Sequence, residues 1–136
     1  MKIWVNGTFD VLHIGHIELI KYADSLKGEN GHLRIGIDTD ERVREKKGEG
    51  RPYNTLEDRM EFMSSIKFVD SVVSFDSDDS LIKRIKEYEP DILVIGDDYK
   101  YHRIIGIEYV PKVMFFEKIE GKSSSKILNY GNNSNR

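Results

Sequence analysis

The sequence predicts an α/β fold in which five parallel strands form one sheet with helices on both of its faces. The order of segments along the chain supports this prediction. Short apolar runs alternate with longer segments of helical periodicity along the 136 residues, and this alternation is typical of βαβ units. Parallel sheets are covered on both faces, and their crossover connections are right-handed.

The five expected strands are short apolar runs bounded by polar or turn residues. The run DILVIG is apolar enough to be a buried strand, whereas the others carry some polar residues. In chain order the strands are expected at residues 2–6, 32–38, 69–75, 91–96 and 112–117.

Three longer segments have the spacing of amphipathic helices. Gly28 can end the first, either Asn54 or Thr55 can cap the second, and Pro90 closes the third. These helices are expected at residues 14–28, 54–66 and 78–90, with a short fourth helix at 124–129.

The composition argues against several classes of protein. The net charge of -3 argues against a nucleic-acid-binding domain, which is usually strongly basic. The chain has no cysteine, so it can form neither a disulfide framework nor a thiolate metal site. We see no signal peptide and no run of about 18 apolar residues that would span a membrane. We therefore expect a cytoplasmic protein with one domain at residues 1–129 and a frayed polar tail at 130–136.

Three polar motifs follow predicted strands: GTFDVLHIGH, GDDYK and EGKSSSK. They are far apart in the sequence, yet the carboxyl ends of parallel strands meet at one edge of a sheet. Ligands of open α/β sheets bind at that edge, near the point where the strand order reverses. The sequence therefore predicts a ligand site built from these motifs.

The first motif has the features of a phosphate site. Gly7 allows a sharp turn, Thr8 supplies a hydroxyl, and the following helix begins with unsatisfied N–H groups. His13 and His16 are three residues apart, so they share a face and can point at one phosphate. Two alternatives are a core histidine with a chance neighbour, and a metal pair, for which no third ligand is visible.

GTFDVLHIGH resembles the HxGH signature of the cytidylyltransferase-like nucleotidyltransferases. GRPYNTLEDRM, GDDYK and EGKSSSKI resemble three further motifs of that family in the same order, so the resemblance extends over about residues 3–128. It implies a Rossmann-like domain that binds a nucleoside triphosphate and a sugar or polyol phosphate, in a homodimer that needs neither nucleic acid nor membrane.

The reaction implied by the resemblance joins a phosphate monoester to the α-phosphorus of the triphosphate and releases pyrophosphate. A phosphate monoester is already an anion near neutral pH, because its second pKa is about 6. The enzyme then needs no general base, but it must position the phosphates and stabilise their charge. We therefore interpret the two histidines as hydrogen-bond donors, aided by Mg²⁺ carried with the nucleotide.

The resemblance also implies roles for individual residues. Arg59 would contact the triphosphate, the alternative being a surface ion pair. The charged stretch 44–54 follows the second strand and contains two glycines and Pro52, which indicates a mobile loop that can close over the substrate, the alternative being a solvated charged loop. Either Lys46 or Lys47 would contact phosphate. The catalytic set is His13, His16, Lys46 and Arg59. The nucleotide-binding set is Gly7, Thr8, Phe9, Asp10, Gly15, Asp97, Gly121, Ser123 and Ser124, and the acceptor-binding set is Lys47, Asp98 and Tyr99.

Two branches of the family fit this length: one adenylylates a heptose 1-phosphate, and the other cytidylylates glycerol 3-phosphate. GRPYNTLEDRM and GDDYKYHRIIG resemble the heptose branch. Lys118 and Ile119 stand where the cytidylyltransferase pattern has arginine and threonine, which weakens the case for cytosine. We therefore favour heptose adenylylation. A non-catalytic nucleotide-binding module is the alternative from another class.

Overall fold

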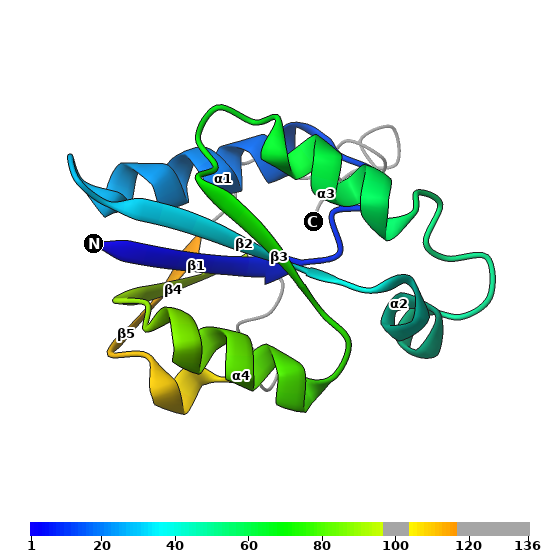
Figure 1. Ribbon diagram of the computed structural model, residues 1–136. Helices are drawn as coiled ribbons and strands as arrows, with labels where there is room; N and C mark the ends of the chain where they lie inside the picture. Colours follow the sequence, from blue (N-terminus) through cyan, green and yellow to red (C-terminus); the bar gives the residue numbers. More distant parts are fainter. Residues whose placement is uncertain (97–103, 117–136) are drawn as a thin grey trace, which may run out of the picture.

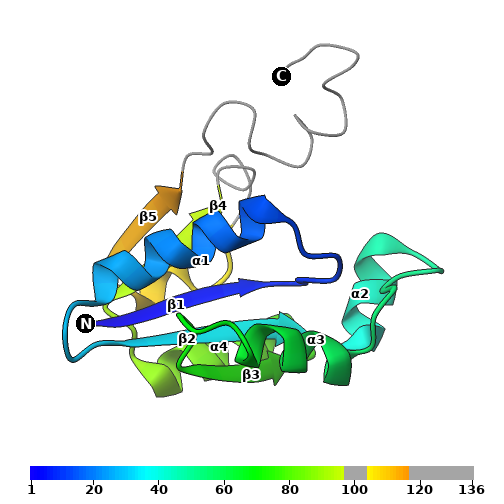
Figure 2. The same ribbon diagram turned by 90° about the horizontal axis from the view of Figure 1, so that it is seen from above.

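The computed structural model describes residues 1–96 and 104–116 (Figures 1 and 2). All strand pairs are parallel, in the order β3-β2-β1-β4-β5. This confirms the predicted Rossmann-like α/β fold and places the reversal of strand order between β1 and β4. The strands are β1 (Lys2–Gly7), β2 (His32–Asp38), β3 (Ser71–Phe75), β4 (Ile92–Gly96) and β5 (Lys112–Phe116).

Helices cover both faces of the sheet, as predicted. Figure 1 shows α1 (Ile14–Lys27) and α3 (Leu56–Ser64) on one face and α4 (Asp78–Tyr88) on the other. A short 3-10 helix, η2 (Ile107–Tyr109), precedes β5, and α2 (Asp40–Lys47) lies beyond the carboxyl ends of the strands.

The two faces of the sheet have separate hydrophobic cores because side chains alternate along each strand. In β1, Ile3 and Val5 pack with Ile20 of α1 and Met63 of α3, all of them buried. The intervening Trp4 belongs to the second cluster, which includes Leu81 and Ile85 of α4. Both layers of helices are thus fixed to the same central strand.

Helix α2 corrects the sequence analysis, which expected a mobile loop at residues 44–54. The helix extends to Lys47, and only the following residues form a loop. Thr39 caps α2 by accepting a hydrogen bond from the backbone N–H of Arg42 at 3.4 Å. Acidic residues occupy its first turn and basic residues its last, which complements the helix dipole. The segment is therefore a helix despite its almost wholly charged sequence.

Other boundaries differ by at most two residues. Thr55, one of the two predicted caps, precedes α3 and accepts from Asp58 N at 3.2 Å. Strand β3 begins at Ser71 rather than at residue 69, because Val69 donates to the Ile66 carbonyl in a turn. The predicted helix at 124–129 and the tail at 130–136 lie outside the described residues.

The amino ends of the strands are joined by side-chain contacts. The Asp70 carboxylate accepts from Lys27 Nζ and from the backbone N–H of Leu33, both at 2.8 Å. Although burial alone would raise it, these hydrogen bonds hold the pKa of Asp70 below its ordinary value. Tyr88 Oη donates to the His32 carbonyl at 2.9 Å. These contacts connect α1, β2 and α4 far from the predicted ligand edge.

Candidate functional site

The turn between β1 and α1 is shaped by Gly7 and Phe9. Phe9 is buried with a positive φ of 51°, and its ring lies edge-on to His16, with the ring centroids 5.7 Å apart. A Cβ atom on Gly7 would lie 3.1 Å from that ring, which is tighter than ordinary contact. Glycine at position 7 therefore lets Phe9 pack beneath the turn and beside the second histidine.

Both histidines form part of the N-terminal cap of α1. His13 is the N-cap residue, and its Nδ1 accepts from the backbone N–H of Gly15 at 3.0 Å. His16 Nδ1 accepts from the backbone N–H of His13 at 3.1 Å, and the two rings lie 4.0 Å apart. Because each Nδ1 is an acceptor, the neutral imidazoles carry their proton on Nε2. The cap thus orients two Nε2–H donors at a helix N-terminus, where anions bind favourably.

Asp10 connects the same turn to the residues just before α3 by hydrogen bonds. Its carboxylate accepts from the backbone N–H groups of Tyr53 and Asn54 at 2.7 and 2.8 Å, and Asn54 Nδ2 donates to the Asp10 carbonyl at 2.6 Å. Burial would raise the pKa of Asp10, but these hydrogen bonds lower it below its ordinary value. The ionised carboxylate therefore positions the loop that follows α2.

Arg59 is fully buried, so it is not the surface ion pair considered as an alternative. Its Nη1 donates to the carbonyls of Thr8 and Asp38 at 3.1 and 2.8 Å. Its Nε donates to the Asn54 carbonyl at 2.9 Å, and its Nη2 pairs with Asp40 at 2.6 Å. Arg59 thus joins the β1–α1 turn, the end of β2, the start of α2 and the cap of α3. The predicted contact with the triphosphate stays a prediction.

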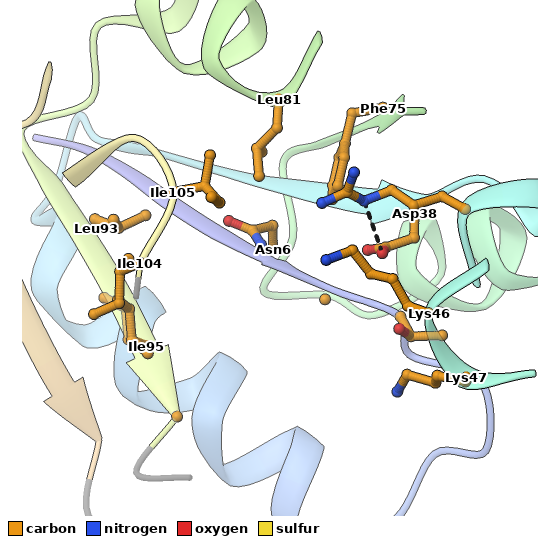
Figure 3. A pocket seen from close by; sticks show the side chains of 15 residues that line it. Asn6, Asp38, Lys46, Lys47, Phe75, Leu81, Leu93, Ile95, Ile104 and Ile105 are labelled. Atoms are coloured by element: carbon orange, nitrogen blue, oxygen red, sulfur yellow. Dashed lines mark ion pairs between the residues drawn. The ribbon is translucent and has the colours of Figure 1, made fainter. Parts of the chain in front are cut away.

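A cavity of about 260 Å³ opens at the carboxyl ends of β1, β2 and β4. Figure 3 shows a polar side with Asp38, Lys46 and Lys47, and an apolar side that includes Leu93 and Ile104. Its size is just below the roughly 300–1,000 Å³ typical of ligand pockets, so it fits a small molecule. Gly7 and Thr8 also line it, and the cavity therefore adjoins the turn that leads to the histidines.

Asp38, at the end of β2, lines the cavity and was absent from the predicted site. Burial raises its pKa above the ordinary value, even though Arg42, Lys47 and Lys46 act in the opposite direction. Arg42, also missed, lines the cavity from α2. Asp38 is the last residue of β2 and Arg42 lies in the first turn of α2, so an acidic residue that ends a strand four residues before an arginine is the signal that could have indicated their contact.

The structure places the predicted residues in two adjoining groups. Gly7, Thr8, Lys46 and Lys47 line the cavity, whereas Phe9, Asp10, His13, Gly15, His16 and Arg59 form or support the β1–α1 turn. Six predicted residues lie outside the described part of the chain: Asp97, Asp98, Tyr99, Gly121, Ser123 and Ser124.

Comparison with known proteins gives one family. The Cytidylyltransferase-like family matches residues 4–128, nearly the whole stretch over which the four motifs suggested it. The Bifunctional protein HldE of Campylobacter fetus subsp. fetus is 41% identical over 127 residues, covering 93% of this chain and 27% of that protein. HldE of Helicobacter hepaticus is 39% identical over 126 residues, covering 93% and 25%. The chain thus spans about a quarter of the length of these relatives.

Solved structures agree on the fold. A crystal structure described as the lipopolysaccharide core biosynthesis protein from Thermoplasma volcanium GSS1 superposes with a TM-score of 0.73 at 24% sequence identity. The match covers 88% of this chain and 98% of that one. At this level of identity the likeness supports the architecture alone.

Proposed function

Because the chain belongs to the cytidylyltransferase-like family of nucleotidyltransferases, we propose that it transfers the adenylyl group of ATP to a heptose 1-phosphate and releases pyrophosphate. The main support for the proposal is that two features lie next to each other at one edge of the sheet. His13 and His16 orient Nε2–H donors at the N-terminus of α1, and a cavity lined by Lys46 and Lys47 adjoins the same turn.

The acceptor phosphate attacks the α-phosphorus of ATP, the bond to the β-phosphate oxygen breaks, and pyrophosphate leaves with the bonding electrons. His13 and His16 donate to triphosphate oxygens, and the helix N-terminus adds about half a positive charge. Lys46 or Lys47 neutralises the incoming phosphate. No side chain must remove a proton, because the attacking phosphate oxygen is already anionic.

The choice of heptose as the acceptor rests on sequence. The segments GRPYNTLEDRM and GDDYKYHRIIG that suggested the heptose branch fall within the stretch similar to HldE. We propose that the chain is the counterpart of the adenylyltransferase domain of HldE. The cavity lined by Lys46 and Lys47 supports a phosphorylated acceptor, because it offers space beside two positive charges.

We propose that Mg²⁺ carried with the triphosphate would neutralise negative charge on its phosphates. Among residues 1–96 and 104–116, no group of three histidine or carboxylate side chains could hold a metal ion. The roles assigned to Asp97, Asp98, Tyr99, Gly121, Ser123 and Ser124 are part of this proposal, as is the homodimer.

In the described part of the chain, no helix is long and apolar enough to cross a bilayer. The cytoplasmic location stays a prediction.

Pyrophosphate release tests the proposal. ATP and CTP are each combined with heptose 1-phosphate, a hexose 1-phosphate, glycerol 3-phosphate or no acceptor. We expect rapid release for ATP with heptose 1-phosphate only. Release for CTP with glycerol 3-phosphate would instead identify the other branch of the family. If nucleotide binds but no acceptor supports release, the chain is a non-catalytic binding module.

A further inference from the structure

Arg42 carries a buried donor that the described part of the protein leaves unused. The residue is only 8% exposed, and it lines the 260 Å³ cavity. Its Nε lies 3.4 Å from Asp38 Oδ2, which is close enough for an ion pair, but within residues 1–96 and 104–116 this N–H has no hydrogen-bond acceptor. Because an unsatisfied buried N–H is costly, a ligand oxygen bound in the cavity would supply the partner that this group lacks.

The rest of the guanidinium group is held in place. Arg42 Nη2 donates to Asp78 Oδ1 at 2.7 Å, and the group lies over the Phe75 ring at 5.4 Å from its centroid. Two carboxylates, Asp38 and Asp78, therefore surround one guanidinium, so its positive charge is already compensated. A neutral hydroxyl oxygen suits this Nε–H better than a phosphate does.

The phosphate of the acceptor has another place to bind. Lys46 and Lys47 line the cavity from the last turn of α2. Figure 3 shows Asp38 between these lysines and the Phe75 end of the cavity, with the apolar side chains of Leu81 and Ile105 nearby. A sugar phosphate can thus place its phosphate at the lysines and its ring against the apolar side.

We propose that Arg42 and Asp38 together determine acceptor specificity by binding one sugar hydroxyl group. Arg42 Nε donates to the hydroxyl oxygen, and the hydroxyl proton is donated to the Asp38 carboxylate. This inference rests on the proposed function, because it takes a sugar phosphate as the acceptor. It extends the proposed function by naming two residues, Arg42 and Asp38, and the hydroxyl group that they recognise.

The test combines variants with deoxy substrates. kcat/KM is measured for wild type and Arg42→Lys with heptose 1-phosphate and with each of its monodeoxy analogues, at saturating ATP. Lysine keeps the charge but lacks the guanidinium Nε–H. We expect wild type to disfavour one analogue by about 10- to 100-fold, as for a hydrogen bond to a charged group. Arg42→Lys should lose that preference, whereas its KM for ATP should stay unchanged.

Two further variants distinguish the loss of one hydroxyl contact from a general loss of activity. Asp38→Asn keeps the shape of the side chain and should weaken discrimination against the same analogue. Asp78→Asn weakens the outer ion pair and leaves Asp38 and Arg42 in place, so discrimination should survive. Thermal unfolding checks that each variant is folded. An equal loss on all analogues in Arg42→Lys and Asp38→Asn would overturn the inference while leaving the proposed function intact. If wild type adenylylates no sugar phosphate, the proposed function fails and this inference fails with it.

Discussion

Arg59 and Arg42 are both buried beside the carboxyl ends of the strands, yet they are used differently. Arg59 makes four hydrogen bonds, three of them to residues distant in sequence, and three of its acceptors are backbone carbonyls. Arg42 pairs with carboxylates, lines the cavity and keeps an Nε–H without an acceptor in the described part of the protein. The difference separates a group that holds the site together from one that we propose to contact the acceptor.

The largest effect should come from Arg59→Met. Removing it leaves three carbonyls and the Asp40 carboxylate without their partner, so we expect unfolding free energy to fall by about 3–5 kcal/mol. Arg42→Met is the matched control and should cost clearly less, because among the described residues its side chain forms a single hydrogen bond, to Asp78, beside the longer ion pair with Asp38. Denaturant unfolding of both variants measures the difference. Equal costs would contradict the distinction between the two arginines.

The histidines allow capping and catalysis to be separated. His13→Asn keeps a good N-cap residue, and His16→Gln keeps a residue type that completes a capping box. Both lose the Nε2–H donor at its present position. We expect turnover to fall on the order of 10²-fold in each variant, while thermal unfolding changes little. If folded His13→Asn and His16→Gln keep near wild-type turnover, the two histidines do not take part in the reaction.

The contributions of Asp70 and Asp38 to folding stability should depend on pH in opposite directions. Asp70 contacts the amino end of β2 through Leu33, and Asp38 is the last residue of that strand. The pKa of Asp70 is lowered, so its interactions stabilise the fold above pH ~4 and are lost as pH falls through the folded pKa. The pKa of Asp38 is raised, so the stability linked to its protonated form is lost as pH rises through the folded pKa.

Unfolding measured between pH 3 and pH 7 therefore distinguishes two variants. The destabilisation by Asp70→Asn should grow with rising pH, whereas Asp38→Asn should become more favourable relative to wild type. Parallel curves for the two variants would contradict the assigned directions.

The smallest effect concerns the loop after α2. Because α2 extends to Lys47, nucleotide should increase amide protection mainly over residues 48–53, and less within the helix. Hydrogen exchange with and without a non-hydrolysable ATP analogue measures this. Protection that rises equally through Asp40–Lys47 would mean that the helix itself orders on binding.

Sequence reasoning found the strands, the order of elements and the histidine pair, because apolar periodicity and short motifs involve residues that are close together in the sequence. It missed α2 because the segment DERVREKK has almost no apolar pattern, although the Thr39 cap and the charge distribution were visible. It could not foresee the partners of Arg59, since Thr8, Asp38, Asp40 and Asn54 meet only after folding. Long-range contacts of this kind leave no local signal.

The most direct test of the account is a competition in one vessel. ATP, CTP, heptose 1-phosphate and glycerol 3-phosphate are supplied together at equal concentrations with Mg²⁺, and the products are identified by mass spectrometry. Product ratios under competition report the ratio of kcat/KM values. We predict ADP-heptose as the dominant product, with pyrophosphate in equal amount. Dominant CDP-glycerol would contradict the proposed substrates, and no nucleotide sugar or polyol at all would contradict the proposed transfer reaction.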